Sequence, residues 1–416
     1  MREMKDSGIE WIGEIPKNWN LTKIGMLYNL RNIKVSDSDY PPLSVTKMGI
    51  LPQLENVAKT NAHDDRKLVK VGDFVINSRS DRRGSCGISD YDGSASLINT
   101  VLTPNAYMHS GYYGWLFKTA EFADEFYKNG HGIVDDLWTT GWQEMKRIVL
   151  PVPSLNQQCY ISDYLDSKCS EIDATSEEIQ KQISILEDYK KSVITEAVTK
   201  GLNPNVEMKD SGVEWIGEIP KNWDIEKIKY HLKREEFRNP GNMEVLSVYR
   251  DYGVVPKNSR DDNHNVTSDD TSKYKHLKKG DLVINKMKAW QGSLAVSYYE
   301  GIVSPAYYIY KFSDEVFNKK YFHYLIRSCY KDEFRRLSGG IREGQWDLSA
   351  ENFENTLVLI PSLPEQKEIV DYLDSKCSEI DSLISEKKQQ LTVLADYKKS
   401  LIYEYVTGKK EVPAYE

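Results

Sequence analysis

Two short loops of this chain carry basic and amide side chains whose chemistry suits nucleic acid. These side chains are Arg79, Arg82 and Arg83 in the first loop and Lys286, Lys288 and Gln291 in the second. An arginine can donate two hydrogen bonds to guanine O6 and N7, a glutamine can pair with adenine N6 and N7, and a lysine or arginine can neutralise a phosphate. A basic loop taken alone is more often plain solvated surface. Its position in the chain therefore decides whether a nucleic-acid-binding role is favoured.

The two loops occupy matching positions in the sequence. GDFVIN precedes the first loop at 72–77 and GDLVIN precedes the second at 280–285, and a Gly-Ser pair follows each loop. These motifs predict a Gly-Asp turn that leads into a buried strand. The loops themselves have equal length but different side chains, SRSDRR against KMKAWQ. This arrangement favours two modules that share a scaffold and read different sequences.

A second variable segment follows in each copy. It reads VDDL in the first copy and REGQ in the second, where it adds Arg342 and Gln345 to the candidate nucleic-acid-binding residues. Trp138 and Trp346 follow these segments at matching positions, and we expect both rings to lie in the core.

Signatures of catalysis are absent from the sequence, which has no Walker loop, GxSxG elbow, Rossmann glycine fingerprint or Asn-Pro-Pro-aromatic motif. The histidines include no pair at ligand spacing and the five cysteines include no CxxC, so we expect neither a metal site nor a disulfide framework. Cys169 and Cys377 fall on apolar helix positions, where we expect small buried hydrophobes rather than reactive thiols. The sequence therefore predicts that this chain is not an enzyme.

The whole chain is one unit written twice. Residues 4–19 match 208–223 at all positions but one, and the string DYLDSKCSEID occurs at 163–173 and again at 371–381. Each copy has nearly constant ends and a divergent middle. This pattern suggests one duplicated scaffold that carries two different inserts and recognises two different targets. Four tryptophans of the first string are expected to anchor an extended lead-in to its domain: Trp11, Trp19, Trp215 and Trp223.

Two long helices are predicted around the second string, because no Pro or Gly lies between that string and Gly201 in the first copy or Gly408 in the second. Apolar residues recur there with heptad spacing over about five repeats. The predicted seam residues are Leu165, Ile172, Ile179 and Leu186 in the first helix and Leu373, Ile380, Ile384, Leu391 and Leu394 in the second. We expect the helices to pair antiparallel, because a globular domain lies between them. The alternative is that each helix packs on its own domain.

These elements predict an α+β fold. It has two globular recognition domains separated by two long helices that pair as an antiparallel coiled coil, with an internal pseudo-two-fold repeat. The expected boundaries are 1–155 for the first lead-in and domain, 156–202 for the central helix, 203–363 for the second lead-in and domain, and 364–416 for the C-terminal helix and tail.

The net charge of −8 argues against a nucleic-acid partner only at first sight. Residues 156–200 carry nine acidic and five basic residues and residues 364–408 carry nine and six, so the helical segments alone contribute −4 and −3. The remaining domains are close to neutral and can present basic faces. No apolar run is long enough to span a membrane and the N-terminus is polar, which predicts a cytoplasmic protein.

Over essentially its whole length the chain resembles the specificity (S) subunits of type I restriction–modification systems. The resemblance lies in the repeated IEWIGEIP-type string, in GDLVINKMKAWQGS at 280–293, in GIVSPAY at 301–307 and in IPSLPEQKEIVDYL at 360–373. The chain departs from the pattern at 156–160, which reads NQQCY where the second copy has PEQKE. The resemblance implies two target recognition domains, each reading one half of a split site on double-stranded DNA.

The resemblance also implies partner proteins. The paired helices would act as a spacer and as the dock for two methyltransferase (M) subunits, and restriction (R) subunits would complete the nuclease. S-adenosylmethionine, ATP and Mg²⁺ would then belong to those subunits, with no cofactor in this chain. Two other classes stay open on the residues alone: a coiled-coil adaptor that binds only proteins, and a self-sufficient nuclease or methyltransferase.

Overall fold

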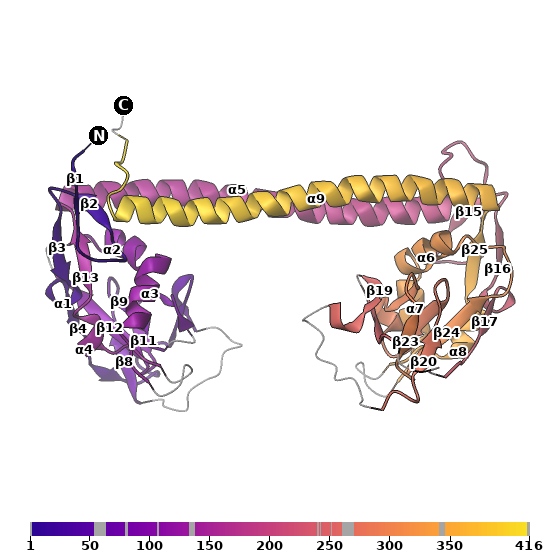
Figure 1. Cartoon of the computed structure of the whole chain (residues 1–416), viewed down its shortest axis with the longest axis horizontal. Helices are drawn as coiled ribbons and strands as arrows, with labels where there is room; N and C mark the ends of the chain where they lie inside the picture. Colours follow the sequence, from indigo (N-terminus) through magenta and orange to yellow (C-terminus); the bar gives the residue numbers. More distant parts are fainter. Residues whose placement is uncertain are drawn as a thin grey trace. The chain divides into compact units, whose positions relative to one another are not determined.

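The computed structural model describes residues 2–53, 64–79, 82–105, 108–132, 138–238, 241, 243–250, 252–259, 270–340 and 346–413. The chain forms two compact units, which we call unit 1 (Met1–Gln180 with Lys388–Glu416) and unit 2 (Lys181–Lys387). Each unit holds one α+β domain together with part of each long helix (Figure 1). The predicted fold class, with two mixed domains and two long helices, is confirmed.

The domain of unit 1 is built from small antiparallel sheets. Its elements are β1 (Met4–Asp6), β2 (Glu14–Pro16), β3 (Asn20–Lys23), α1 (Ile24–Leu27), β4 (Tyr28–Leu30), β5 (Lys34–Val35), β6 (Leu43–Thr46), β7 (Gly49–Pro52), β8 (Arg66–Val69), β9 (Phe74–Asn77), β10 (Cys86–Ile88), β11 (Gly93–Ala95), β12 (Asn99–Pro104), α2 (Ser110–Phe117), α3 (Ala120–Lys128), α4 (Trp142–Met145) and β13 (Val149–Val152). The central sheet has the order β10-β9-β12-β4, a second sheet has the order β11-β8-β5, and β6 pairs with β7 as a hairpin. All four residues of β9 are buried, and the apolar run Phe74–Ile76 predicts this for the first three.

The domain of unit 2 repeats this plan. Its elements are β14 (Met208–Asp210), β15 (Glu218–Pro220), β16 (Asp224–Lys227), η3 (Ile228–Tyr230), β17 (Leu232–Arg234), β18 (Leu246–Tyr249), β19 (Gly253–Pro256), η4 (Lys257–Ser259), β20 (Lys275–Leu277), β21 (Leu282–Asn285), η5 (Ala289–Gln291), β22 (Leu294–Val296), β23 (Gly301–Val303), β24 (Tyr307–Phe312), α6 (Lys319–Ser328), α7 (Lys331–Leu337), α8 (Ala350–Asn355) and β25 (Leu357–Ile360). Its central sheet has the order β17-β24-β21-β22, which matches β4-β12-β9-β10 of unit 1 strand for strand, and β18 pairs with β19 as β6 does with β7.

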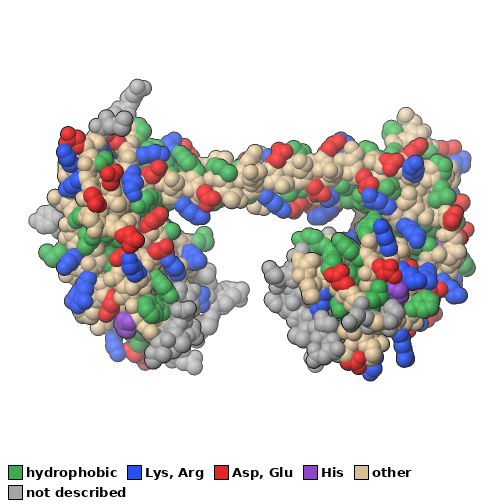
Figure 2. Space-filling view, in the orientation of Figure 1, with side chains coloured by type: hydrophobic (Ala, Val, Ile, Leu, Met, Phe, Trp, Pro, Cys, Tyr) green, Lys and Arg blue, Asp and Glu red, His purple; other side chains and the backbone are tan. Residues whose placement is uncertain are grey.

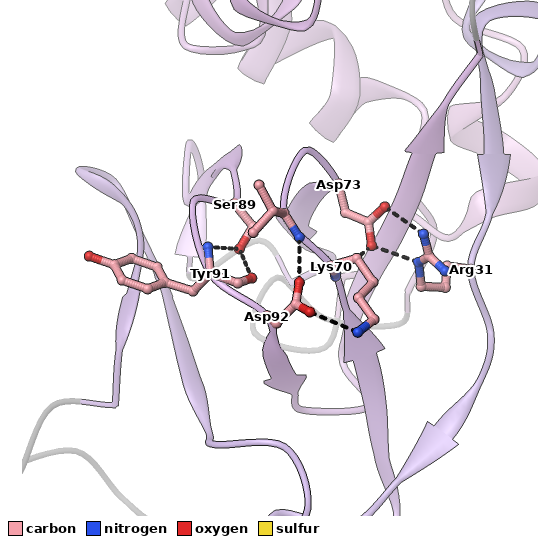
Figure 3. A network of polar contacts seen from close by, with 7 residues as sticks. Arg31, Lys70, Asp73, Ser89, Tyr91 and Asp92 are labelled. Carbon is pink, nitrogen blue, oxygen red and sulfur yellow. Dashed lines mark hydrogen bonds and ion pairs between the residues drawn. The ribbon is translucent and has the colours of Figure 1, made fainter.

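The Gly-Asp turn before β9 is a polar junction around the buried carboxylate of Asp73 (Figure 3). Asp73 accepts from Arg31 Nε at 2.6 Å and from the Lys70 N–H at 2.8 Å, and the Gly72 N–H donates to the Ser89 carbonyl at 2.8 Å. Gly72 has a φ of +86°, a left-handed conformation that glycine adopts at little cost. The turn before β21 has the same backbone contacts, so this junction belongs to the shared scaffold.

The two long helices are α5 (Leu155–Lys200) and α9 (Leu363–Val406). In unit 1, Lys398 Nζ binds the Asp173 carboxylate at 2.6 Å, and in unit 2, Lys190 Nζ binds the Asp381 carboxylate at the same distance. Early residues of one helix thus meet late residues of the other, which shows antiparallel pairing within each unit. Acidic, basic and hydrophobic side chains are interspersed along the helix surface (Figure 2).

The predicted heptad seam is the buried face of these helices. Leu165, Ile172, Ile179, Leu373, Ile380 and Ile384 are buried, and Leu186, Leu391 and Leu394 are half-buried. Two seam positions are polar, Lys190 and Lys398. Both side chains are half-buried, and each forms an ion pair across the helix pair, with Asp381 and Asp173 respectively. Cys169 and Cys377 are buried on the same face, and burial raises the pKa of Cys169 to about 11, so these thiols are inert at neutral pH. Among the described residues, no helix combines the length and the apolar character needed to cross a membrane.

The lead-in tryptophans anchor each lead-in to its domain, but the two copies differ in one contact. Trp19 and Trp223 are fully buried, and in unit 2 Trp223 Nε1 donates to Glu365 Oε1 at 2.9 Å. The residue at the matching position of unit 1 is Gln157, whose amide oxygen accepts from Ser154, and Trp19 Nε1 has no hydrogen-bond partner. The unusual NQQCY sequence at the start of α5 thus has a structural consequence.

Removing the Glu365 carboxylate is expected to destabilise unit 2. Glu365→Ala leaves the buried Trp223 N–H without an acceptor, which should lower the free energy of unfolding by about 1–3 kcal/mol. Gln157→Glu in unit 1 should raise it by about 1 kcal/mol, because a carboxylate can then accept from Trp19. Urea unfolding followed by tryptophan fluorescence measures both. Equal free energies of unfolding for Glu365→Ala and Gln157→Glu would contradict the stabilising role of a carboxylate at this position.

Candidate nucleic-acid interface

Both candidate loops start where a buried central strand ends, the first after β9 and the second after β21. In unit 1 the Thr140 N–H donates to the Ser78 carbonyl at 2.9 Å, and in unit 2 the Leu348 N–H donates to the Lys286 carbonyl at 3.0 Å. Both residues of the first contact lie 208 positions before those of the second, so the two contacts are equivalent. Each loop therefore lies beside the segment that follows the second variable stretch of its own unit.

The loop of unit 1 exposes all three of its arginines, Arg79, Arg82 and Arg83. Arg83 forms an ion pair with Asp124 of α3, and its guanidinium carbon lies 5.2 Å from the centre of the Tyr127 ring. The Arg79 backbone is held by a bond from its N–H to Asn77 Oδ1 at 3.0 Å. Arg83 is thus fastened to the domain by its side chain, whereas Arg79 is positioned through its backbone.

The loop of unit 2 is a tight turn that ends at Gly292, whose φ of +91° lies in the left-handed region. Lys288 is exposed and Gln291 is half-buried. Lys286 Nζ lies 3.2 Å from Asp347 Oδ2, and both side chains keep about a third of their surface exposed. A pair this accessible contributes little to stability, so Lys286 can exchange Asp347 for a phosphate at small cost.

The prediction that Trp138 and Trp346 lie in the core is wrong. Both rings are half-buried, because the segments that carry them lie beside the loops at the domain surface. Trp138 Nε1 donates to the Tyr127 carbonyl at 2.9 Å, and the Trp346 ring packs edge-on against Trp290 at 5.8 Å. Each tryptophan therefore forms an apolar wall beside the basic loop of its unit.

Two of the predicted DNA-binding residues, Arg342 and Gln345, lie outside the described residues. The remaining six come together as two clusters, one in each unit, at the same end of the equivalent central strand. The sequence did not reveal the acidic partners Asp124 and Asp347. Asp124 belongs to an Asp-Glu-Phe string that recurs in the second copy at 332–334, and this repetition is the signal that could have drawn attention to it.

Each cluster combines exposed cations, an amide or hydroxyl group and an aromatic wall. This set can neutralise phosphates and donate hydrogen bonds to base edges, the two kinds of contact that position a protein on DNA and read its sequence. Within the described parts of the chain, no group of three or more His, Cys, Asp or Glu side chains is arranged to hold a metal ion.

Comparison with known proteins agrees with this arrangement. Residues 217–393 match the model of the type I restriction modification DNA specificity domain. The type I restriction enzyme MjaVIII specificity subunit of Methanocaldococcus jannaschii is 28% identical over 284 residues, which cover 64% of this chain and 63% of that protein. The putative type I restriction enzyme MjaX specificity subunit of the same organism is 24% identical, and the alignment covers 96% of both chains.

Two solved structures share the fold. A chain from a study of complex assembly and conformational transition of the type I R-M system superposes with a TM-score of 0.71 at 12% identity, covering 95% of this chain and 99% of that chain. The HsdS subunit from Thermoanaerobacter tengcongensis superposes with a TM-score of 0.54 at 13% identity, covering 95% of this chain and 98% of that chain. At these identities the two superpositions support the fold alone.

The chain combines a duplicated α+β unit, paired long helices and a basic loop at the same strand end of each unit. Residues 217–393 match the type I restriction modification DNA specificity domain, and the chain is similar to type I restriction enzyme specificity subunits.

Proposed function

We propose that this chain reads a bipartite site on double-stranded DNA, with unit 1 recognising one half-site and unit 2 the other. The observation that carries the proposal is the pair of equivalent clusters, in which one backbone contact places two loops of different side chains. A single scaffold that presents SRSDRR in one copy and KMKAWQ in the other is suited to two different target sequences. The cations would bind phosphate, and the arginine, lysine and glutamine head groups would contact base edges.

We further propose that the chain is not catalytic and that methyltransferase and restriction subunits bind to it. The helices support this, because exposed apolar side chains recur on them outside the seam: Ile185 and Tyr189 on α5, and Val393 and Tyr397 on α9. Each residue of the second pair lies 208 positions after its mate in the first. Two equivalent patches suit two copies of one partner, which supports two M subunits. S-adenosylmethionine, ATP and Mg²⁺ would be held by the partner subunits.

Mapping of methylated bases in a host that co-expresses this chain and its M subunit tests the proposal. We expect one motif made of two short defined blocks around an undefined spacer of constant length. The purified complex should bind this motif with an affinity that falls steeply as salt rises, because phosphate contacts release counterions.

Other outcomes would contradict the proposal. A single continuous motif or a freely varying spacer would exclude two independent half-sites. A protein-only adaptor would show no salt-dependent DNA binding, and a self-sufficient enzyme would methylate or cleave DNA as the purified chain alone.

A further inference from the structure

We propose that the tip of one β-hairpin in each unit reads DNA bases together with the basic loop beside it. The hairpins are β6–β7 in unit 1 and β18–β19 in unit 2. The tip residues that we assign to this role are Lys47 and Met48 in unit 1 and Arg250 and Tyr252 in unit 2. This inference rests on the proposed function and adds a second recognition element to each half-site.

Each hairpin packs against the strand that follows the basic loop of its unit. In unit 1, a Cβ atom on Gly87 of β10 would lie 3.0 Å from Gly49 Cα. In unit 2, a Cβ atom on Gly253 would lie 3.3 Å from the Cβ of Ala295 in β22. Gly49 matches Gly253 and Gly87 matches Ala295 in the repeat, so this close contact is equivalent in both units. In both units the glycine that ends the tip therefore packs on the middle residue of the strand that follows the basic loop.

In unit 2 the tip is fastened through Arg327 to the strand that follows the loop. Arg327 of α6 donates from Nη2 to the Arg250 carbonyl at 2.6 Å and from Nη1 to the Leu294 carbonyl at 2.8 Å. The Arg250 side chain also lies against Gly292, the last residue of the loop turn, since a Cβ on Gly292 would be 3.7 Å from Arg250 Cγ. The tip and the loop thus form one continuous surface.

In unit 1 the tip is an ordered turn of its own. Thr46 Oγ1 donates to the Gly49 carbonyl at 3.0 Å and accepts from the Met48 N–H at 3.1 Å. These two bonds hold the backbone of the turn, so Met48 is presented in a defined position although its side chain is 83% exposed.

The two hairpins are most alike at the base, where the first strands begin with Leu-Ser-Val and the second strands end with Pro. Leu43 pairs with Pro52 at the base of one hairpin and Leu246 pairs with Pro256 at the base of the other. The tips, in contrast, differ in sequence and by one residue in length. Each tip still carries one cation and one large exposed apolar side chain, and Tyr252 is 59% exposed. A constant base with a variable tip is the pattern that the basic loops also show.

The chemistry of the tips suits the major groove of DNA. That groove admits a two-stranded β-ribbon, and its base edges include the guanine acceptors and the thymine methyl group. Lys47 and Arg250 can donate to guanine, Met48 can contact a thymine methyl, and the Tyr252 ring offers apolar area with a polar end.

The test removes each pair of tip side chains in the complex with co-expressed M subunit. We expect Lys47→Ala with Met48→Ala to relax the methylation motif at one or more positions of one half-site and to lower affinity for the site about ten-fold. Arg250→Ala with Tyr252→Ala should do the same at the other half-site only. Because all four side chains are exposed, circular dichroism should show unchanged folding.

Matched controls lie at the opposite ends of the same central strands. Val71→Ala, in the turn before β9, and Lys279→Ala, in the turn before β21, remove exposed side chains and should leave motif and affinity unchanged. If the tip variants behave like these controls, the inference is overturned. A uniform loss of affinity with an unchanged motif would place the tips on phosphates and overturn their reading role. If the wild-type complex shows no bipartite motif, the proposed function itself is contradicted, and the inference that rests on it fails as well.

Discussion

Alanine at Lys286, Lys288 and Gln291 is expected to lower the affinity of the complex for its DNA site by about 100-fold and to relax the motif in one half-site only. A contact specific to one base pair is worth about 1–3 kcal/mol, so the loss of two or three such contacts gives an effect of this size. Loss of phosphate contacts by the lysines should also make binding less sensitive to salt. Filter binding at several salt concentrations and mapping of the methylated motif measure the two effects separately.

The equivalent change in unit 1 is alanine at Arg79, Arg82 and Arg83, which should relax the other half-site. We expect a smaller loss of affinity there, because the Arg83 guanidinium already forms an ion pair with Asp124 and a cation–π contact with the Tyr127 ring. Alanine at Lys278 and Lys279, two exposed lysines before β21, is the control for lost charge and should leave the motif intact. The assignment of the loops is wrong if both triple variants keep wild-type affinity and motif.

Asparagine at Ile380, Ile384 and Leu391 is expected to unfold the paired helices and prevent assembly with M subunits. Ile380 and Ile384 are buried on the seam and Leu391 is half-buried. Each buried isoleucine loses its apolar contacts and leaves an amide with poor partners, at a cost of about 2–5 kcal/mol. Two or three such losses approach the whole stability of a typical domain. Thermal unfolding by circular dichroism at 222 nm and co-purification with M are the measurements.

The neighbouring residue provides a matched control on the same helix. Leu383 is 46% exposed whereas Ile384 is 7% exposed, so Leu383→Asn should change stability by less than about 1 kcal/mol. Equal effects of Leu383→Asn and Ile384→Asn would show that the heptad pattern does not define the contact between the helices.

Features that depend on local pattern were predictable from the sequence. The repeat showed that the chain contains one unit twice. The heptad spacing selected seam positions that are all buried except Leu186, Leu391 and Leu394, which are half-buried. The position of Arg79 and Lys288 after the central strands followed from the Gly-Asp motifs. In each case a backbone period or a turn residue sets the geometry within a few residues, so no distant contact has to be known.

Features that depend on distant side chains were decided only by tertiary structure. Trp138 and Trp346 match in the repeat yet lie at the surface beside the loops, because burial depends on what packs against both faces of a ring. The partners of Arg83 and Trp223, which are Asp124 and Glu365, lie about 40 and 140 residues away in the sequence. The sequence by itself determined the two-fold duplication, the paired helices and the two basic loops. The fold alone decided which cations are held by carboxylates and which hairpin lies beside each loop, since packing of distant elements, unlike helical or strand period, leaves no local pattern in the sequence.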